Sequence, residues 1–539
     1  MGILYYGDNL DVMKRHISDQ SVDLVYLDPP FNSNQNYNVL FKEQDGAKAA
    51  SQILAFEDTW TWDSEDVAVY QELVMRPGKL SELLQGFYTF LGPCNLMAYV
   101  VMMAPRLVEL KRVMKDTASI YLHCDTTASH YLKLLMDAVF GKENYRNEIV
   151  WLRSNPKSHI SINFPCCTDI ILRYSKTHQC IFYPQYGQHD DEYIKNAYKY
   201  HDDKGQYRFL PLLNPNDDRP NLKYEFLGIT RVWRWSKDRM EKAYKDGIVV
   251  QLKPGSVPQY KKYLHDSKGK TVTNCWTDIK QSAGNESLGY PTQKPITLLE
   301  RIINASSNEG DTVLDPFCGC GTTIAAAQKL KRKWIGIDIT HIAVTLMKHR
   351  LKDMYNLEPF GKKNPDGYRV IGEPVSVQDA QALADADKYQ FQYWALGLVG
   401  ARPEKQDEKK GADKGIDGKI IFFEEILANK IQTVVISVKG GNANVAHVRD
   451  LRGVVEREKA AIGVLITMQE PTSPMMQEAA SAGFYESVTW GKKYPKIQIL
   501  TIRELMDQDA PKTVLMPPTK ATFQKAQRVV MDAHQQLKL

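Results

Sequence analysis

The motif LDPPF (27–31) combines a carboxylate, two prolines and an aromatic ring at the end of a nearly continuous apolar segment. Such a segment is typical of a strand buried on both faces. Pro29 and Pro30 fix an extended backbone and remove two N–H donors, so that carbonyl groups can lie beside the carboxylate of Asp28. Phe31 adds a ring face for stacking. A pocket of this kind accepts two hydrogen bonds from an amino group held against an aromatic plane. The alternative is a rigid loop in which Asp28 has a capping role.

A second acidic turn, DPFCGCGTT (315–323), lies between a short apolar segment and a helix-like one. Closely spaced glycines let the backbone approach a ligand, and the free N–H groups at a helix start can bind a carboxylate or phosphate. The next strand-like segment, KWIGID (333–338), ends in Asp338, where a carboxylate can accept hydrogen bonds from two ribose hydroxyls. Together these features favour a nucleoside cofactor site over glycines needed for packing alone.

The elements that must position these turns alternate between strand-like and helix-like patterns, which predicts a parallel sheet covered by helices. The alternation covers residues 1–152 and returns over 276–354. The economical interpretation is one α/β domain interrupted by an insertion, residues 153–275. The expected strands are 21–28, 119–125, 311–315 and 333–339, and the expected helices are 103–115, 130–141, 295–307 and the segment after the glycine turn, 319–330.

The insertion carries most of the chain's positive charge. The whole chain of 539 residues has a net charge of +5. Residues 153–275 contain 21 lysines and arginines against 13 acidic residues, a net charge of +8, and 11 of the 28 tyrosines. Cations interleaved with aromatic rings suit a polyanion such as DNA, with the charges on phosphates and the rings against bases or sugars. A solvated basic surface is the alternative for this composition.

Composition excludes several classes of protein. A hydrophobic content of 43% and a charged content of 25% are ordinary globular values, which argues against disorder and fibrous structure. Eight cysteines without paired metal-ligand spacing suit a reducing cytoplasm. The longest apolar segment, 96–105, is about half of a membrane span. We therefore expect a cytoplasmic protein with no membrane partner.

A second α/β unit is expected over residues 387–539, after a polar linker, 355–386. Within it, Asp417 precedes one strand and Lys439 ends the next, after VVISVK (434–439). Adjacent strands that present Asp and Lys together are what a magnesium-dependent phosphodiesterase needs, because the carboxylate holds the metal and the lysine stabilises charge on the phosphate. The expected helices are 387–401, 447–459 and 474–483, and the expected strands are 419–426, 433–441 and 461–468.

Three motifs of the first domain resemble the signature motifs of S-adenosylmethionine-dependent DNA amino-methyltransferases. They are DPPF (28–31), YPTQKPITLLE (290–300) and DPFCGCGTT (315–323). Their order resembles the circularly permuted beta group, in which the target-recognition segment lies between them. The resemblance covers about residues 1–353. It implies a Rossmann-like methyltransferase core with an inserted target-recognition domain, S-adenosylmethionine as cofactor and double-stranded DNA as partner.

The resemblance also implies roles for individual residues. Asp28 and the carbonyl of Pro29, held in the Asp28–Pro29–Pro30 turn, would bind the exocyclic amino group of a flipped base, with Phe31 stacked on its ring. Hydrogen bonds from the amino protons would favour a more tetrahedral, reactive nitrogen without a covalent enzyme intermediate. Lys294 would lie near the methionine end of the cofactor, and Asp8 would meet its adenine. The remaining cofactor residues implied are Asp315, Phe317, Gly319, Gly321 and, on the ribose, Asp338.

The target base implied by the family pattern is adenine. Its adenine enzymes usually carry Asp at the first position of this motif and its cytosine-N4 enzymes usually Ser, so Asp28 favours methylation of N6 of adenine over N4 of cytosine. A DNA-binding protein without catalysis is a further alternative. The residues singled out for DNA contact are Arg153, Arg231, Arg234 and Lys237.

Residues 387–490 resemble the Mrr-like branch of PD-(D/E)xK restriction endonucleases. The family's pattern places Glu, Asp or Gln two residues before the lysine, where this chain has Ser437, a poorer metal ligand. The resemblance therefore supports an α/β restriction-endonuclease-like fold more strongly than it supports cleavage. A magnesium-dependent nuclease with Asp417, Ser437 and Lys439 at its site and an inactive DNA-binding or regulatory relic both stay open, as does a homodimer.

Overall fold

The computed structural model describes residues 2–30, 37–42, 48–56, 62–155, 164–282, 286, 288, 290, 292–361, 364–404, 415–425, 430–507, 509–523, 526 and 528, with the backbone alone for 37–42 and 48–56. The chain divides into two compact units, Met1–Tyr183 with Asn274–Leu539, and Pro184–Thr273. Among the described residues, no helix is long and apolar enough to cross a membrane.

A nine-stranded sheet forms the centre of the first unit, in the order β16-β6-β7-β5-β2-β17-β18-β1-β19. β2, β17, β18 and β1 run parallel, so their carboxyl ends meet at one edge. β2 and β17 are hydrogen-bonded neighbours, and this pairing joins the first predicted α/β stretch to the second. The strands are β1 (Ile3–Tyr6), β2 (Val22–Leu27), β5 (Met114–Cys124), β6 (Tyr145–Leu152), β7 (Thr168–Ser175), β16 (Cys275–Trp276), β17 (Thr312–Asp315), β18 (Lys333–Asp338) and β19 (Arg369–Ile371).

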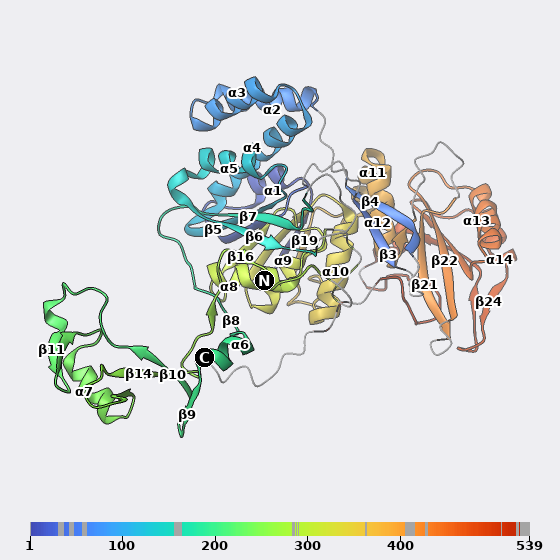
Figure 1. Cartoon of the computed structure of the whole chain (residues 1–539). Helices are drawn as coiled ribbons and strands as arrows, with labels where there is room; N and C mark the ends of the chain where they lie inside the picture. Colours follow the sequence, from blue (N-terminus) through green and yellow to red (C-terminus); the bar gives the residue numbers. More distant parts are fainter. Residues whose placement is uncertain are drawn as a thin grey trace. The chain divides into compact units, whose positions relative to one another are not determined.

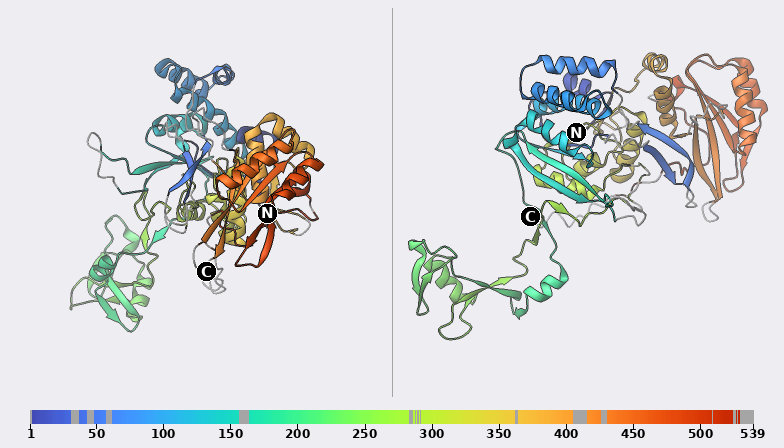
Figure 2. Two further views of the ribbon diagram at one scale, coloured as in Figure 1. Left: turned by 90° about the vertical axis from the view of Figure 1, so that its right-hand side faces the viewer. Right: turned by 45° about the horizontal axis from the view of Figure 1, so that its top comes forward.

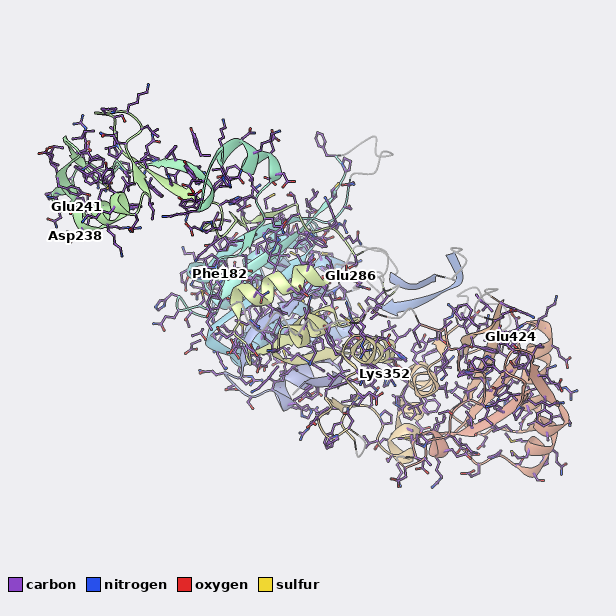
Figure 3. The ribbon with its side chains drawn as sticks, turned by 90° about the horizontal axis from the view of Figure 1, so that it is seen from below. Phe182, Asp238, Glu241, Glu286, Lys352 and Glu424 are labelled. Carbon is purple, nitrogen blue, oxygen red and sulfur yellow. The ribbon has the colours of Figure 1, made fainter. Side chains whose placement is uncertain are left out.

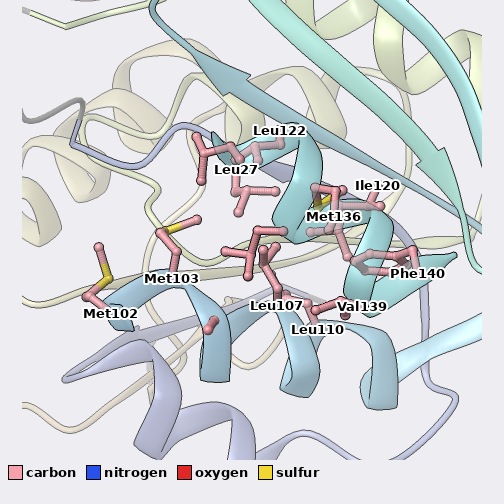
Figure 4. Packing of buried hydrophobic residues seen from close by; sticks show 14 of the residues in the cluster. Leu27, Met102, Met103, Leu107, Leu110, Ile120, Leu122, Met136, Val139 and Phe140 are labelled. Atoms are coloured by element: carbon pink, nitrogen blue, oxygen red, sulfur yellow. The ribbon is translucent and has the colours of Figure 1, made fainter. Parts of the chain in front are cut away.

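Helices cover both faces of this sheet (Figure 1). On one face, α4 packs with α5 against β2 and β5, through apolar side chains such as Leu27, Leu107, Leu122 and Met136 (Figure 4). The helices of this unit's first half are α1 (Asn9–His16), α2 (Ser64–Met75), α3 (Lys79–Leu91), α4 (Asn95–Val113) and α5 (Ser129–Phe140), and those on the opposite face are α8 (Ile296–Ser306), α9 (Thr322–Lys329) and α10 (His341–Tyr355). A hairpin of β3 (Tyr37–Lys42) and β4 (Lys48–Phe56) follows β2.

The second unit, Pro184–Thr273, is built on a four-stranded antiparallel sheet in the order β13-β14-β10-β9. It is shorter than the predicted insertion, 153–275, because β7 pairs with β5 and β6 in the central sheet. Its elements include α6 (Asp191–Ala197), β9 (Tyr200–Asp202), β10 (Gly205–Pro211), β11 (Lys223–Phe226), β12 (Ile229–Val232), α7 (Lys237–Lys245), β13 (Val249–Val250) and β14 (Gln259–Tyr263).

The C-terminal part of the first unit has a five-stranded sheet of its own, in the order β20-β21-β22-β23-β26. Helices lie on both faces of this sheet (Figure 2). Each face has its own apolar cluster, one shared with α12 and one with α13 and α14. The main elements are α12 (Lys388–Val399), β20 (Arg402–Pro403), β21 (Gly418–Glu425), β22 (Lys430–Lys439), α13 (Val445–Arg457), β23 (Ile462–Thr467), α14 (Ser473–Ser481), β24 (Phe484–Ser487), β25 (Lys492–Pro495) and β26 (Ile497–Thr501).

The predicted α/β class is confirmed for both sheets, and each strand and helix predicted from sequence has its counterpart. The segment predicted as a linker, 355–386, has a larger structural role. It contributes β19, which pairs in parallel with β1 at the edge of the central sheet, and α11 (Val377–Ala386). With only three residues, β19 is too short for its sequence pattern to distinguish a strand from a loop.

Candidate functional site

A cavity of about 370 Å³ opens at the edge where the parallel strands end. This volume lies within the range of small-molecule sites. Nine of the residues proposed from sequence line it: Asp8, Asp28, Pro29, Pro30, Lys294, Asp315, Phe317, Gly319 and Asp338. Gly321 lies beside it, at the start of α9. Phe31 lies outside the described residues.

Asp28, the first residue after β2, has two carboxylate oxygens in different surroundings. Oδ2 is 2.5 Å from Nζ of Lys294, and the two side chains are largely buried. Oδ1 is also buried and has no hydrogen-bond partner in the part of the chain that the structure describes. An unpaired buried acceptor is costly unless a ligand pairs with it. The site therefore holds one buried carboxylate oxygen without a described partner, beside the rigid Pro29–Pro30 backbone.

The glycine turn before α9 requires glycine for geometric reasons. Gly321 caps α9 in the left-handed conformation, with φ +75°, and a Cβ atom there would lie 2.4 Å from Cγ of Met347. Gly319, with φ +48°, donates its N–H to Oδ2 of Asp338 at 2.9 Å. The turn is thus held against the end of β18, with its backbone close to the cavity.

Two further carboxyl groups of the cavity wall have raised pKa values. Burial raises the pKa of Asp315 to about 7, against hydrogen bonds from Thr323 and from the Phe317 N–H at 3.0 Å. Burial likewise raises the pKa of Asp338 to about 6, although Oδ1 accepts hydrogen bonds from the N–H and hydroxyl of Thr340. Both groups are therefore poised to change protonation near neutral pH, which is common where carboxylates meet a ligand.

Asp8 lines the cavity, and both of its oxygens have protein partners. Oδ1 caps α1 by accepting the N–H groups of Leu10 and Asp11, and Oδ2 accepts from Arg106 at 2.6 Å. Arg106 also donates to Asn9, which in turn donates to the carbonyl of Pro316 at 2.8 Å. Sequence reasoning missed Arg106 and Asn9, because their role depends on α4 lying beside the first turn of α1. The proposed contact of Asp8 with the cofactor stays a prediction.

Tyr26 is a further cavity residue that sequence reasoning missed. It is buried in β2, two residues before Asp28. The period of a strand is two, so a strand that continued past Leu27 would place Tyr26 and Asp28 on the same face, and both residues do line the cavity. This alternation is the sequence pattern from which Tyr26 could have been predicted as a cavity residue.

The residues proposed for DNA contact do not all lie in one unit. Arg231 lies on β12, Lys237 is the first residue of α7, and Arg234 lies between these two elements. All three side chains are exposed in the unit Pro184–Thr273. Nε of Arg234 donates a hydrogen bond to the carbonyl of Leu213 at 2.9 Å. Arg153 belongs to the first unit, where Nε lies 3.2 Å from Oδ1 of Asp169.

In the C-terminal domain, Asp417 is buried and its oxygens are engaged by protein donors. Nε2 of Gln392 donates to Oδ1 at 2.9 Å, while the hydroxyl of Ser437 and the N–H of Val438 donate to Oδ2 at 3.2 and 2.6 Å. Lys439 ends β22, opposite Thr467 of β23. The sequence motif thus forms a structural hydrogen-bond network around a carboxylate.

A second carboxylate of this domain belongs to Glu424 on β21, which is labelled in Figure 3. It accepts hydrogen bonds from Tyr485, Ser487 and the N–H of Thr489. Among the residues with described coordinates, no group of three His, Cys, Asp or Glu side chains could hold a metal ion.

Two family models match the chain. Residues 22–349 match a family described as DNA methylase, and residues 390–507 match one described as NACHT-associated inactive restriction endonuclease 1. The resemblance to DNA methyltransferases is therefore confirmed at the level of family, and the second match confirms a restriction-endonuclease-like region without naming the Mrr-like branch.

The curated relatives that match the chain include methyltransferases. The type II methyltransferase M.EcaI of Enterobacter cloacae is 33% identical over 258 residues, which cover 47% of this chain and 57% of the relative. The Mod subunit of the type III restriction-modification enzyme StyLTI of Salmonella typhimurium is 28% identical over 351 residues, covering 61% and 50%. The chain spans about half the length of these relatives.

Matches among solved structures include the following two. The M1.HpyAVI–SAM complex is 16% identical with a TM-score of 0.29, covering 63% of this chain and 93% of that chain. The cytosine-N4-specific PvuII DNA methyltransferase is 12% identical with a TM-score of 0.32, covering 64% and 85%.

Proposed function

The chain belongs to the DNA methylase family, and on that premise we propose that it methylates the N6 amino group of adenine in double-stranded DNA, with S-adenosylmethionine as donor. The observation that carries the proposal is the pair of acceptors at the end of β2. Oδ1 of Asp28 is buried without a partner among the described residues, next to the constrained carbonyl of Pro29. Two acceptors suit the two protons of an exocyclic amino group.

The cavity wall fits the cofactor by the chemistry of its groups. Asp338 and Asp315 are buried carboxyls that could accept from hydroxyl or ammonium groups, and Gly319 and Gly321 keep the neighbouring backbone free of side chains. When bound, S-adenosylmethionine supplies an electrophilic methyl group on a positively charged sulfur. We propose Asp338 for its ribose, and Asp315, Phe317 and the glycine turn for the rest of the molecule.

The protein's own residues would activate and orient the amino nitrogen. The lone pair of an arylamine is delocalised into the ring, so the nitrogen is a poor nucleophile. Hydrogen bonds to Asp28 and Pro29 would draw the amino group out of the plane of the ring and localise its lone pair. Lys294, through Oδ2, would hold the Asp28 carboxylate in one orientation. Once the nitrogen has gained the methyl group it must lose a proton, and Oδ1 of Asp28 is the acceptor that we propose for it.

The adenine must leave the duplex to enter this cavity, at a cost of a few kcal/mol in stacking and pairing. We propose that the basic unit Pro184–Thr273 offsets this cost by binding the DNA backbone, with Arg231, Arg234 and Lys237 on its surface as contact residues. Arg153 is a further proposed contact from the first unit.

The test of this function uses the full-length protein, duplex DNA and methyl-labelled S-adenosylmethionine. We expect N6-methyladenine after digestion of the product to nucleosides. Label in N4-methylcytosine would show that the target base is cytosine and not adenine. Absence of label in DNA, from protein that binds the cofactor, would contradict the proposal. Sequencing of the methylated DNA would then give the recognition sequence.

For residues 387–539 we propose a restriction-endonuclease-like domain that does not cleave DNA. The carboxylate of Asp417 already accepts hydrogen bonds from Gln392, Ser437 and Val438. In addition, Ser437 stands where this fold usually has a metal-binding side chain. Incubation with magnesium and unmethylated DNA should leave the DNA intact. Cleavage that is lost in both Asp417→Ala and Lys439→Ala would instead establish a magnesium nuclease and a self-contained restriction–modification enzyme.

We further propose that the protein acts in the cytoplasm, because its proposed substrate is chromosomal DNA and the relatives named above are bacterial. A homodimer is the assembly to be tested, by sedimentation of the full-length protein with and without DNA.

A further inference from the structure

Helix α10 contacts both the glycine turn of the cavity and the C-terminal domain. Toward the turn, Nη1 of Arg350 donates to the carbonyl of Cys320 at 3.2 Å and to the hydroxyl of Thr322 at 2.9 Å. Met347, on the same helix, is the side chain against which Gly321 is packed. Cys320 and Thr322 both line the cavity. One side of α10 is therefore fixed to the part of the wall for which we propose a cofactor contact.

Another side of α10 faces the C-terminal domain. Thr345, His349 and Asp353 follow one another at intervals of four residues, so they share one face of the helix. The ring of His349 stacks on that of Phe523, with 4.5 Å between the ring centroids. Oδ2 of Asp353 accepts a hydrogen bond from the N–H of Ala526 at 3.2 Å. The last part of the chain thus contacts α10 along this face.

Helix α12 of the C-terminal domain approaches α10 so closely that it requires a glycine. Gly397 lies within α12, and a Cβ atom there would lie 2.8 Å from Oγ1 of Thr345. Glycine is a poor helix former, and the close approach of Thr345 is the reason that the structure supplies for it. About two turns earlier on α12, Oε1 of Gln390 accepts the N–H of His341 at the start of α10, at 3.4 Å. The two helices are therefore in contact at two positions.

An apolar cluster connects this contact with the cavity. Its members are Tyr290, Cys320, Ile342 and Leu346, with Tyr393 of α12 and Phe523 packed against them. Tyr290 and Cys320 also line the cavity. The ring of Tyr290 lies against the glycine turn, since a Cβ atom at Gly319 would be 3.2 Å from its Cε1. The C-terminal domain is thus packed directly behind two residues of the cavity wall.

We propose that the C-terminal domain completes the cofactor site, with Gly397, Tyr393 and Phe523 as positioning residues. Through them the domain would hold the Tyr290 ring and the glycine turn in the shape that binds the cofactor. The inference rests on the proposed function, because it takes this cavity as the cofactor site, and it gives the non-cleaving domain a role in methylation. Binding to a turn that is already ordered costs less than ordering the turn on binding. Loosening the domain from α10 should therefore weaken cofactor binding.

Gly397→Ala tests the close approach of the two helices in the full-length protein. Alanine favours the helix itself, but its Cβ atom would push α12 away from Thr345, whose branching at Cβ restricts its rotation. We expect the dissociation constant of S-adenosylmethionine, measured by calorimetry without DNA, to rise about 5-fold or more. The double variant Gly397→Ala/Thr345→Ala removes the atom that clashes, so its affinity should return close to that of the wild type.

Gly453→Ala is the matched control. Gly453 lies within α13 of the same domain, and nothing lies within 4 Å of the added atom, so cofactor affinity should equal that of the wild type. Phe523→Ala is an independent variant that removes the ring from His349 and from the apolar cluster, and it should weaken binding as Gly397→Ala does. Wild-type affinity in both variants would overturn the inference. A loss in Gly397→Ala that Thr345→Ala does not restore would also overturn it.

Hydrogen exchange supplies a readout that needs no cofactor. Peptides covering residues 315–325 should exchange faster in Gly397→Ala than in the wild type or in the double variant, because the turn is held less firmly. Equal exchange in all three proteins would contradict the inference. By linkage, bound cofactor should slow exchange over α12 in the wild type. Failure of the wild type to bind S-adenosylmethionine, with the differences in exchange over 315–325 as expected, would instead contradict the proposed function alone.

Discussion

Lys294 and Asp28 form an ion pair of 2.5 Å across a sequence separation of 266 residues. One partner follows β2 and the other precedes α8, and the parallel pairing of β2 with β17 brings the two ends of the domain together. Breaking such a pair from one side leaves a largely buried charge without its partner, which costs about 3–5 kcal/mol for fully buried pairs and less beside an open cavity.

Lys294→Met should therefore lower the stability of the first unit and slow methylation by about 10-fold or more, because Asp28 loses the contact that orients it. Thermal unfolding and single-turnover rates measure the two effects. The double variant Asp28→Asn/Lys294→Met removes both charges, so its melting temperature should recover while its activity stays low. Lys329→Met, which breaks the more exposed pair with Glu300, is the control and should change neither quantity appreciably. Full activity in Lys294→Met would refute the orienting role.

Asp28→Asn should reduce methylation at least about 100-fold, because the amide keeps the shape but loses a charged acceptor aimed at the amino group. Cofactor affinity, measured by calorimetry without DNA, should change little, since Asp28 faces the proposed base site. A variant with near wild-type rate would show that another group activates the nitrogen. Loss of cofactor affinity alone would move Asp28 to the cofactor side of the cavity.

Gly321→Ala tests the close packing of the glycine turn. The left-handed φ of +75° penalises any Cβ atom, and here that atom would also lie 2.4 Å from Met347. Gly310→Ala is a matched control: its φ is +85°, but nothing lies within 4 Å of the added atom. Both variants should lose about 1 kcal/mol or more of stability from the backbone alone. Gly321→Ala should lose additional stability and bind S-adenosylmethionine more weakly. Equal losses in the two variants would rule out a contribution from the clash.

Cofactor affinity should depend on pH through Asp315 and Asp338. Their pKa values, about 7 and about 6 in the ligand-free protein, exceed the usual value for Asp, so the folded state holds protons that the unfolded chain has released. The free energy of unfolding should accordingly fall as the pH rises from about 4 to about 7. A ligand that donates hydrogen bonds or carries positive charge favours the ionised carboxylates, so its binding releases protons and strengthens over the same range.

Calorimetric titrations in buffers of different ionisation enthalpy measure this proton release directly. The dissociation constant of S-adenosylmethionine should decrease between pH 5.5 and 8, by at most about tenfold per pH unit for each proton released. Asp338→Asn should flatten the lower part of the profile. Uptake of protons on binding would contradict the assignment of these two carboxyls to the cofactor.

Much of this site was readable from sequence, and the part that was not has a physical reason. Asp315 and Asp338 end parallel strands and Asp28 directly follows one, so the apolar patterns that predict the strands also predict that their ends meet. The partners of these residues come from elsewhere: Lys294 was expected near the cofactor and lies against Asp28, and Arg106 reaches Asp8 from α4. Side-chain pairing between distant segments has no local signature.

The C-terminal motif shows the limit of reading residue types alone. Asp417 and Lys439 were predicted from adjacent strands that exist as expected, β21 and β22. The hydrogen bonds from Gln392 and the N–H of Val438, which occupy the carboxylate, depend on the position of α12 and on one backbone amide. A pattern of Asp and Lys cannot distinguish an acceptor open to a metal from one already satisfied.

Asp417→Ala should therefore act on stability rather than on catalysis. It would leave the buried donors of Ser437, Val438 and Gln392 without their acceptor, at about 1–3 kcal/mol for each donor that water cannot reach. We expect earlier melting of the C-terminal domain and an unchanged single-turnover rate of methylation. Lys439→Ala, at the end of the same strand β22, is the control and should melt close to the wild type. Limited proteolysis across a temperature series would locate the change, since new cleavage should begin within 387–539. Unchanged stability together with loss of a DNA-cleaving activity would instead make Asp417 a catalytic ligand.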